Sequence, residues 1–383
     1  MKIVFISNYF NHHQKHISDA LFRLTDGNYY FISISKISEE RIKLGYSTDG
    51  APEYVKYNYG SEAKMRECQR LIDEADVAIW GSAPYSLLET RLKNKKLTFA
   101  YSERLFKQKK SWWKLPLYAL RNIKRYAWHK NYFLLCASAF AAADYAKTLA
   151  FCGKAYKWGY FPEFIDYPDV ESVIEAKKPN SIMWCARFID WKHPEIPVEI
   201  AKRLRADGYD FTLNMIGNGE LLEKTRRSIT DAGLEDCVFA PGAVKASEVR
   251  RYMEESEIFL FTSDRNEGWG AVLNESMNSA CAVVANGAIG AVPFLVKNGE
   301  NGFIYKDGDI DGIYRKVKSL LDDRDERIEL SKNAYLTVKN EWNAENAAKK
   351  FIALCEKMLA GEYKPFPYEN GVCSKAEILK DFK

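Results

Sequence analysis

The chain has 383 residues, of which 47% are hydrophobic and 28% charged, and a net charge of +4. This length is too great for one ordinary core and predicts two domains of about 150–200 residues each. The composition predicts a soluble globular protein. It excludes a membrane-spanning helix, which needs about 18 uninterrupted apolar residues, and the mild charge does not by itself imply a nucleic-acid partner.

The eight cysteines are scattered along the chain, and no two of them form a C-x-x-C pair. Several lie inside apolar runs, as Cys136 does, which indicates reduced core thiols in a cytosolic protein. Residues 1–8 are predicted to begin with a strand rather than a signal peptide, because the apolar run is short and polar residues follow at once. We therefore expect a cytoplasmic protein.

In the first half of the chain, short β-rich runs alternate with helical patterns. Such alternation predicts parallel βαβ units with right-handed crossovers. The predicted strands cover residues 3–7, 29–34, 77–80, 97–101 and 132–137, and the predicted helices cover 13–24, 62–74 and 139–151.

Two X-Pro steps and a polar stretch interrupt this pattern at about residues 160–180, where we place the linker. The pattern then restarts, with strands at 181–185, 211–216, 238–240, 258–262 and 282–285, helices at 194–205, 247–254 and 271–279, and three helical segments to about Leu359. The expected domains are residues 1–165 and 166–361. A tail of about 362–383, with a short helical pattern after Pro367, is expected to pack back on the first domain.

Two carboxylates, Glu267 and Glu275, flank a Gly-rich turn that follows the strand 258–262 and opens a helix. Glycines let a ligand approach the backbone closely, and the free N–H groups of a helix start suit a diphosphate. One carboxylate lies in the loop and the other on the helix, so both can face one bound molecule. Taken alone, the pair would also fit a solvated helix start, which the helix dipole favours.

This stretch resembles the E-x7-E motif of family-four retaining glycosyltransferases. The resemblance is strong over residues 180–310 and extends elsewhere only as an overall pattern. It implies an α/β protein of the GT-B fold, with two facing Rossmann-like domains, a cleft between them, an acceptor-binding N-terminal domain and a nucleotide-sugar-binding C-terminal domain. Supporting features occur in the family's order: the basic pair Arg187 and Lys192, a G-x-G turn at 217–219, a base-binding turn at 239–244, a Gly-rich loop at 287–293 and a hairpin at 298–302.

The resemblance also implies roles for individual residues. Glu275 would bind the ribose hydroxyls, and Glu267 would contact the hydroxyls of the donor sugar. Arg187 and Lys192 would pair with the diphosphate and stabilise the charge that develops as the nucleotide leaves, which is the largest effect available. Without this context both cations would be ordinary surface charges. The other implied donor-binding residues are Gly217, Gly219, Val244, Gly268, Trp269, Gly270, Ala271 and Val272.

The resemblance further implies that the anomeric configuration is retained and that the leaving phosphate takes the acceptor proton. No metal and no cofactor are then expected, and the nucleotide-sugar is a substrate. UDP is the expected nucleotide because it is the commonest in the family, and GDP is the alternative. The expected acceptor is a glycan or a lipid-linked sugar, in cell-surface polysaccharide synthesis by analogy.

The N-terminal half departs from the family pattern at two places. The loop after the first strand has no glycine and carries His12, His13 and Gln14, for which we expect acceptor contacts. His12 and His16 have zinc-binding spacing without an evident third ligand, and a plain polar helix start is also open. The family's usual His after a later strand is missing. Glu103 stands nearby as the candidate catalytic residue that orients the acceptor hydroxyl, or it pairs with Arg104.

Residues 104–130 combine many basic residues with aromatic and aliphatic ones and contain no Asp or Glu. This pattern suits a helix that lies at an anionic membrane surface, on the inner face of the cell membrane. A helix packed on its own domain with a solvated basic face is the alternative. Nucleic acid is not expected, because no known binding module accompanies the patch.

Other functions compete with the glycosyltransferase interpretation. A non-catalytic module that binds a sugar-nucleotide or a membrane would keep Arg187 and Glu275 but show no turnover. A sugar-nucleotide epimerase would lack the E-x7-E motif in its Gly-turn context, and the chain is far too short for a glycogen phosphorylase. A NAD-dependent oxidoreductase needs G-x-G-x-x-G after the first strand, where residues 8–14 have no glycine.

Overall fold

The structure is a computed structural model that describes residues 1–37, 50–107, 115–362 and 366–379. The chain divides into an N-terminal unit, Met1–Glu163 with Asn343–Lys380, and a C-terminal unit, Phe164–Trp342. The first crossing lies close to the expected boundary at 165. The expected end of the C-terminal domain at 361 differs from the structure, because the chain returns to the N-terminal unit at Asn343.

The N-terminal unit is built on a parallel sheet of seven strands in the order β3-β2-β1-β4-β5-β6-β7. All five residues of β1 are buried, as expected of a strand covered on both faces. The strands are β1 (Ile3–Ser7), β2 (Tyr29–Ser33), β3 (Val55–Tyr57), β4 (Val77–Trp80), β5 (Leu97–Ser102), β6 (Tyr132–Cys136) and β7 (Ala155–Lys157). The helices are α1 (His12–Leu24), α3 (Glu62–Glu74), η1 (Tyr85–Leu88), α4 (Glu89–Lys93), α5 (Leu115–Asn122), η3 (Ile123–Ala127), α6 (Ala141–Ala146) and α15 (Ala344–Leu359).

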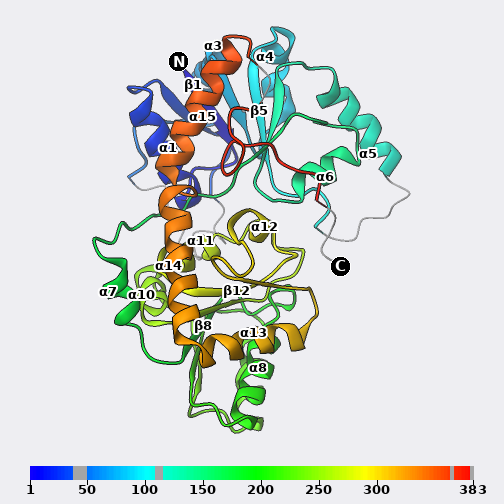
Figure 1. The fold of residues 1–383 in the computed structure, drawn as a ribbon. Coiled ribbons are helices and arrows are strands. Elements are labelled where there is room, and N and C mark those ends of the chain that lie inside the picture. Colours follow the sequence, from blue (N-terminus) through cyan, green and yellow to red (C-terminus); the bar gives the residue numbers. More distant parts are fainter. Residues whose placement is uncertain (38–49, 108–114, 363–365, 380–383) are drawn as a thin grey trace. The chain divides into compact units, whose positions relative to one another are not determined.

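Helix α15 explains why the domain boundary was misplaced. It begins at Asn343, whose side chain accepts a hydrogen bond from the backbone of Asn346 at 2.9 Å. It then runs beside α1 (Figure 1) and buries Phe351 against the ring of Phe99, with 5.1 Å between centroids. An amphipathic pattern predicts such a helix, but it does not say which sheet the apolar face will cover.

The tail also lies on the N-terminal unit. Lys375 forms an antiparallel bridge with Tyr156 of β7, and the Cys373 side chain is fully buried. The short helical pattern expected after Pro367 is wrong for the described residues 366–379, which form turns and this bridge. The backbone bonds of this segment go to β7 instead, from Ala376 N to Ala155 O at 2.9 Å.

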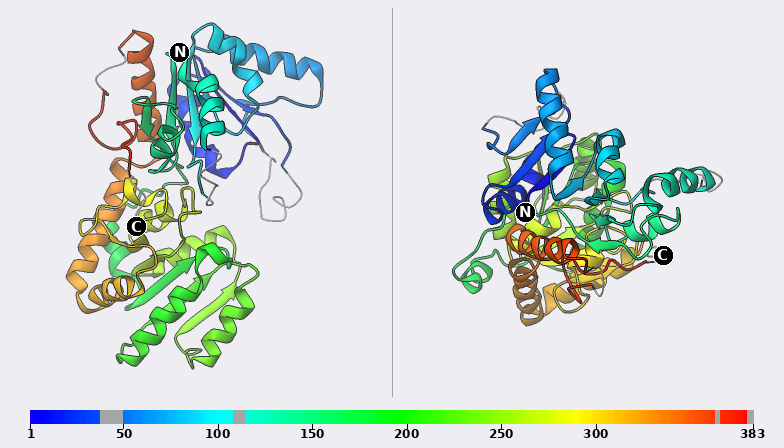
Figure 2. Two further views of the ribbon diagram at one scale, coloured as in Figure 1. Left: turned by 90° about the vertical axis from the view of Figure 1, so that its right-hand side faces the viewer. Right: turned by 90° about the horizontal axis from the view of Figure 1, so that it is seen from above.

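The C-terminal unit has a six-stranded parallel sheet in the order β10-β9-β8-β11-β12-β13. Helices lie on both faces of each sheet (Figure 2). The strands are β8 (Ser181–Cys185), β9 (Thr212–Ile216), β10 (Val238–Gly242), β11 (Ile258–Phe261), β12 (Ala282–Asn286) and β13 (Phe303–Tyr305). The helices are α7 (Val170–Glu175), η4 (Asp190–Lys192), α8 (Glu195–Ala206), α9 (Leu222–Asp231), α10 (Ala246–Glu255), α11 (Val272–Asn278), α12 (Val292–Leu295), α13 (Ile310–Asp322) and α14 (Arg324–Asn340).

The core of the C-terminal unit is formed by its strands and by the helices that cover them. Helices α8, α9 and α13 pack over β8, β9 and β11 through buried residues such as Trp184, Leu213 and Leu260. The expected linker region contains α7, which packs on α14 within the same unit. Ligands of such sheets bind at the carboxyl ends of the strands, and the predicted donor-site residues lie there.

Candidate active site

Four adjacent strands of the C-terminal unit end at one edge of the sheet, and a loop with predicted donor-site residues follows each of them. Strands β10, β9, β8 and β11 are neighbours and run parallel. Their carboxyl ends therefore bring together the loops that carry Val244, Gly217, Arg187 and Glu267. The loop after β10, with Ala243 and Val244, is open to solvent.

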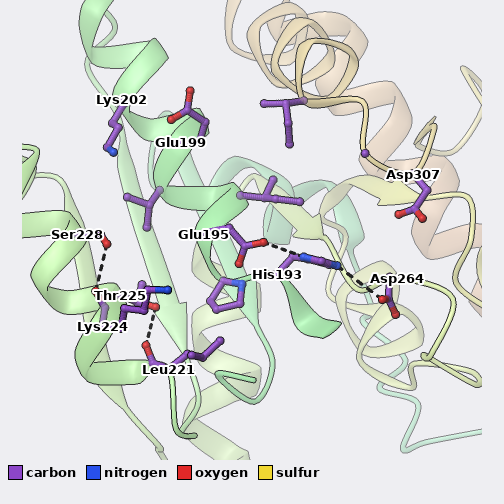
Figure 3. A pocket seen from close by; sticks show the side chains of 15 residues that line it. His193, Glu195, Glu199, Lys202, Leu221, Lys224, Thr225, Ser228, Asp264 and Asp307 are labelled. Carbon is purple, nitrogen blue, oxygen red and sulfur yellow. Dashed lines mark hydrogen bonds and ion pairs between the residues drawn. The ribbon is translucent and has the colours of Figure 1, made fainter. Parts of the chain in front are cut away.

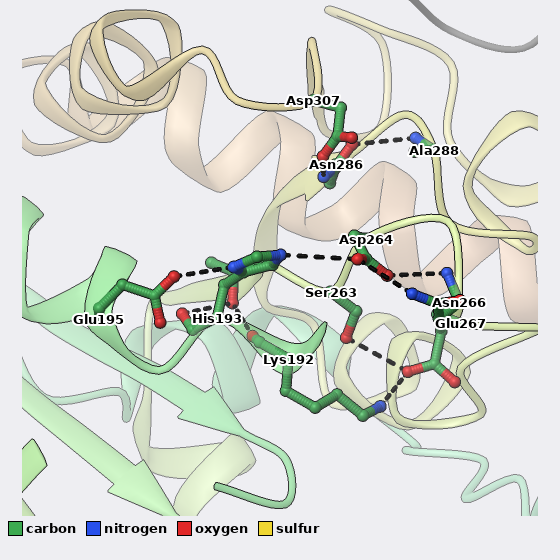
Figure 4. A network of polar contacts seen from close by, with 11 residues as sticks. Lys192, His193, Glu195, Ser263, Asp264, Asn266, Glu267, Asn286, Ala288 and Asp307 are labelled. Atoms are coloured by element: carbon green, nitrogen blue, oxygen red, sulfur yellow. Dashed lines mark hydrogen bonds and ion pairs between the residues drawn. The ribbon is translucent and has the colours of Figure 1, made fainter. Parts of the chain in front are cut away.

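Lys192 and Glu267 meet directly at this edge (Figure 4). Lys192 Nζ donates to Glu267 Oε2, and Ser263 Oγ donates to the same oxygen at 3.2 Å. The two charged side chains are only 11% and 12% exposed. A partly buried pair of this kind is held in a fixed geometry, with both charges available to a ligand that enters between them.

Trp191 lies between the two predicted cations, and the sequence analysis missed it. The Lys192 ammonium is 4.4 Å from the centre of the indole ring, and the Arg187 guanidinium carbon is 5.7 Å from it. Both distances allow cation–π attraction. The sequence does place a Trp next to Lys192 in a loop after a strand. The high aromatic content of the chain does not single out this Trp from the others.

Hydrogen bonds join the loop after β8 to the loop after β11. Thr262 Oγ1 donates to the carbonyl of Lys192 at 2.7 Å, and Trp184 Nε1 donates to Thr262 Oγ1 at 2.8 Å. The N–H of Asp264 donates to the carbonyl of Trp191 at 3.1 Å. The relative position of Lys192 and Glu267 is therefore set by backbone groups as well as by their own ion pair.

The glycines of the G-x-G turn serve packing between loops. A β-carbon on Gly217, at φ +142°, would stand 1.9 Å from the carbonyl oxygen of Ala186. One on Gly219, at φ +157°, would stand 2.3 Å from the carbonyl oxygen of Phe188. Both carbonyls flank Arg187, so these glycines let the loop after β9 support the loop that carries this cation.

The turn after Glu267 also requires a glycine because of packing within the fold. Gly270 has a φ of +91°, and a β-carbon there would stand 2.3 Å from the ring of Phe261. Trp269 points away from the edge: its indole is 1% exposed and donates to Asn274 Oδ1 at 2.9 Å. Because the ring is buried, a donor contact by Trp269, as predicted, would have to come from its backbone rather than from its indole.

Glu275, for which ribose binding is predicted, lies near the end of β8. Burial and the nearby Glu275 carboxylate raise the pKa of the Cys185 thiol to about 12, whereas Lys192 acts in the opposite direction. Both charged groups thus lie close to Cys185, the last residue of β8. Helix α11, which carries Glu275, starts just after Gly268, Ala271 and the turn between them, with Val272 as its first residue.

A cavity of about 720 Å³ lies beside the loop after β8 (Figure 3). Its walls come from the starts of α8 and α9 and from the loops after β11 and β13. His193 and Asp264 line it, whereas Lys192 and Glu267 do not. The cavity is therefore a neighbour of the predicted donor site and is separate from it.

Glu103 has partners other than the expected one. Tyr160 Oη donates to Glu103 Oε1 at 2.8 Å, and Lys107 forms an ion pair with the other oxygen. The alternative pairing of Glu103 with Arg104 is wrong, because Arg104 is buried and pairs with Asp144 at 3.4 Å. A guanidinium this deeply buried needs an equally buried carboxylate, which Asp144 provides. Glu103 lies just after β5 and pairs with Tyr160 and Lys107 instead.

The histidines of the first loop lie near Glu103. The side chain of Asn11 caps α1 by accepting from the N–H of His13 at 2.8 Å. The His13 ring contacts the ring of Tyr160, the residue that donates to Glu103, in a tilted arrangement with 5.5 Å between centroids. Burial, and secondarily His16, lowers the pKa of His12. Gln14 is largely buried in α1, with 8% of its surface exposed, so it is less available to an acceptor than His13.

The described residues contain no group of three or more His, Cys, Asp or Glu side chains placed to hold a metal ion. Asp307 and Asp309 have the Asp-x-Asp spacing, but each has a partner within the fold. Asn286 Nδ2 donates to Asp307 at 2.6 Å, and Asp309 caps α13 by accepting from the N–H of Gly312 at 2.8 Å.

The structure describes the basic aromatic segment at residues 104–107 and 115–130. Its residues 108–114, which include Lys109, Lys110, Trp112 and Trp113, lie outside the described part. Helix α5 continues as the π-helical turn η3. Leu117, Leu120 and Trp128 are 64%, 68% and 78% exposed. Arg121, Lys124 and Lys130 are exposed among them. Among the described helices, none is long and apolar enough to cross a membrane.

Comparison with known proteins agrees with this geometry. Residues 169–337 match the model of the glycosyl transferases group 1. The amylovoran biosynthesis glycosyltransferase AmsK of Erwinia amylovora is 26% identical over 186 residues, 47% of this chain and 46% of the relative. A GDP-mannose-dependent phosphatidylinositol monomannoside mannosyltransferase of Mycobacterium tuberculosis is 23% identical over 76% of this chain and 77% of its own. The chain thus spans about half the length of AmsK.

Solved structures agree on the fold of the whole chain. The structure of Anabaena HepE in complex with UDP has a TM-score of 0.69 and 15% identity, and the match covers 94% of this chain and 100% of HepE. An identity this low shows a shared fold and no more. That fold consists of two parallel α/β domains of the GT-B type. The C-terminal unit thus matches the model of the group 1 glycosyl transferases over residues 169–337, and both units have the GT-B type of fold.

Proposed function

We propose that the protein is a retaining glycosyltransferase that moves a sugar from a nucleotide-sugar, a UDP-sugar, to a glycan or lipid-linked acceptor in cell-surface polysaccharide synthesis. The observation that carries this proposal is the contact of Lys192 with Glu267 beside Arg187, at the carboxyl edge of the C-terminal sheet. A site with two cations and two carboxylates on neighbouring loops fits a ligand that has a diphosphate and several hydroxyls.

Each charged group has a part in the proposed reaction. Arg187 and Lys192 bind the diphosphate and stabilise the negative charge that grows on it as the bond to the sugar breaks. Glu267 binds hydroxyls of the donor sugar, and Glu275 binds those of the ribose. The leaving phosphate takes the proton of the acceptor hydroxyl, so the charge balance of this step needs no metal.

Glu103 is the candidate for orienting the acceptor. Tyr160 and Lys107 hold its carboxylate at the end of β5, and the ring of His13 contacts the ring of Tyr160. A carboxylate that is already hydrogen-bonded keeps its orientation when it accepts a further hydroxyl. Glu103→Gln is expected to raise KM for the acceptor and to leave the affinity for the nucleotide unchanged.

The names of relatives support both nucleotides that the site could hold. HepE was crystallised with UDP, and the mycobacterial mannosyltransferase is named for GDP-mannose. The proposal is tested by incubating the protein with UDP-sugars and GDP-sugars and lipid-linked acceptors and measuring nucleotide release. Proton NMR of the product then shows whether the anomeric configuration of the donor is kept. Nucleotide binding without release in every combination would favour the non-catalytic module.

We further propose that the surface of Leu117, Leu120, Arg121, Lys124 and Trp128, the α5 surface, binds an anionic membrane. Its exposed apolar side chains can insert between headgroups, and each basic residue near such a surface adds about 1 kcal/mol. This would place the enzyme on the inner face of the cell membrane, within reach of a lipid-linked acceptor.

Vesicle sedimentation tests the α5 surface. Arg121→Glu with Lys124→Glu should reduce binding to vesicles that contain phosphatidylglycerol. The charge-matched control, Lys64→Glu with Lys93→Glu, changes two exposed lysines elsewhere on the N-terminal unit and should bind as the wild type does. If the wild type does not sediment with these vesicles, the membrane proposal fails and the glycosyltransferase proposal stands unaffected.

A further inference from the structure

His193 follows Lys192 directly and lies between two carboxylates from different elements (Figure 4). Its Nδ1 is 2.7 Å from Oε1 of Glu195, at the start of α8. Its Nε2 faces Oδ2 of Asp264, on the loop after β11, at an ion-pair distance of 3.7 Å. One ring therefore connects the element that carries Lys192 with the loop that carries Glu267.

Asp264 in turn organises the short turn that leads to Glu267. Its carboxylate accepts from the backbone N–H of Asn266 at 2.7 Å and from the Asn266 side-chain amide at 3.1 Å. Its carbonyl accepts from the N–H of Glu267 at 3.0 Å. A shift of the Asp264 carboxylate would therefore be transmitted to Glu267 through this turn.

The backbone of His193 is itself unusual. It has a φ of +54° and a ψ of +57°, in the left-handed region that glycine and asparagine enter most easily. A β-carbon there costs conformational free energy, which surrounding contacts must offset. Here the two carboxylate contacts of the imidazole provide that compensation, so the side chain has a reason to be present where glycine would fit the backbone.

We propose that His193 is a positioning residue, which holds the loop of Lys192 against the loop of Glu267 by bridging Glu195 and Asp264. The proposal rests on the proposed function for the meaning of the Lys192–Glu267 pair. Asp264 and Glu195 raise the pKa of His193 to about 10, so at neutral pH the ring is cationic and both of its contacts are charge-assisted.

Replacement by glycine removes the ring without straining the backbone, so His193→Gly should fold. The ring is 29% exposed and lines the cavity of about 720 Å³, so free imidazole can reach the space it leaves. We expect kcat to fall about 10- to 100-fold, because catalysis is sensitive to small misplacements. The affinity for UDP should change by less than about 3-fold, and added imidazole should restore part of kcat.

Two further variants separate positioning from a general effect on the cavity. His193→Asn accepts the same backbone but reaches the two carboxylates less well, and its kcat should fall between those of His193→Gly and the wild type. Glu199→Gln changes a residue of the same cavity that pairs with Arg203, and its kcat should equal that of the wild type. A wild-type kcat for His193→Gly, or no response of its kcat to imidazole, would overturn the proposal.

Amide hydrogen exchange provides a readout that does not need turnover. The N–H groups of Asp264 and Glu267 bond to Trp191 O and Asp264 O and should exchange faster in His193→Gly than in the wild type. If the wild type transfers no sugar, the proposed function fails, and faster exchange in the variant still supports the positioning role. Unchanged exchange at both amides would contradict that role in either case.

Discussion

Lys192 and Glu267 are 75 positions apart in the sequence, yet their charged groups touch at the edge of the C-terminal sheet. Each satisfies the other in the absence of a ligand, which keeps two partly buried charges paired. A nucleotide-sugar would take the ammonium with its phosphates and the carboxylate with its sugar hydroxyls. In the proposed reaction the two members of the pair therefore have separate roles once the donor is bound.

Replacing Lys192 tests the charge-stabilising role. Lys192→Ala should lower kcat about 100-fold or more, because the leaving diphosphate loses a fixed positive charge. Lys192→Arg keeps the charge and should retain more activity, and Lys202→Ala, in the neighbouring cavity, should behave as the wild type. Steady-state kinetics with the preferred donor decide the matter, and wild-type rates in Lys192→Ala would exclude this residue from catalysis.

Trp191 is expected to contribute to donor affinity through the two cations that flank its ring. A cation–π contact contributes about 0.5–2 kcal/mol, so Trp191→Leu should weaken UDP binding about 3- to 30-fold. Trp191→Phe keeps an aromatic face and should show a smaller loss. Both affinities are measured by calorimetry, and equal binding by Trp191→Leu and the wild type would show that the ring only fills space.

Glu275 is expected to bind the ribose. Glu275→Ala should weaken the binding of UDP, because a carboxylate that accepts hydrogen bonds from two hydroxyls contributes about 1.5–3 kcal/mol. Glu300→Ala is the control, since Glu300 is exposed and pairs only with Lys297 in the described structure. Unchanged affinity in Glu275→Ala would remove this residue from the donor site.

Trp269 should matter for stability and little for the donor. Trp269→Phe leaves the buried Asn274 Oδ1 without its indole donor, which costs about 1–3 kcal/mol of unfolding free energy. Urea denaturation measures this loss. KM for the donor should stay near the wild-type value, and a large increase in KM without loss of stability would indicate that the ring contacts the sugar.

The raised pKa of His193 predicts a pH dependence of stability. Asp264 and Glu195 hold this pKa at about 10 in the folded chain, against about 6.5 for an unfolded His. The stabilisation by the protonated ring is complete below pH 6.5 and is lost as the pH rises through 10. Three further charged residues, Glu199, Lys224 and Asp307, line the same cavity of about 720 Å³ as His193.

This dependence is measured against His193→Asn, which does not titrate. The Tm difference between the wild type and this variant should shrink steadily from pH 6 to pH 10. A difference that stays constant over that range would show that the charge of His193 adds nothing to the stability of the fold.

The sequence predicted that these loops lie at one edge of the sheet, because each loop follows a strand and parallel strands end together. Glu267, Arg187 and the G-x-G turn could be placed this way without knowing any distance. Other features depend on tertiary packing, which a local pattern does not contain. The side of α15, the burial of Trp269 and the pairing of Arg104 with Asp144 are decided by which partner is near in space.

His193 shows a different reason for a missed residue. Its role depends on a left-handed backbone and on Asp264, which is distant in the sequence. Neither is visible in a single chain, where a lone His after Lys192 has no recognisable spacing to other ionisable groups. The same holds for Glu103, whose partners Tyr160 and Lys107 come together only when β5 is in place.

Calorimetric titration of the wild type and Lys192→Ala with UDP and with GDP, without added metal, tests whether the loops around Lys192 and Glu267 bind a nucleotide. We expect the wild type to bind UDP and to bind GDP weakly or not at all, and we expect Lys192→Ala to bind UDP more weakly than the wild type does. If the folded wild type binds neither nucleotide, the loops around Lys192 and Glu267 are not a nucleotide-sugar site and the proposed function is wrong.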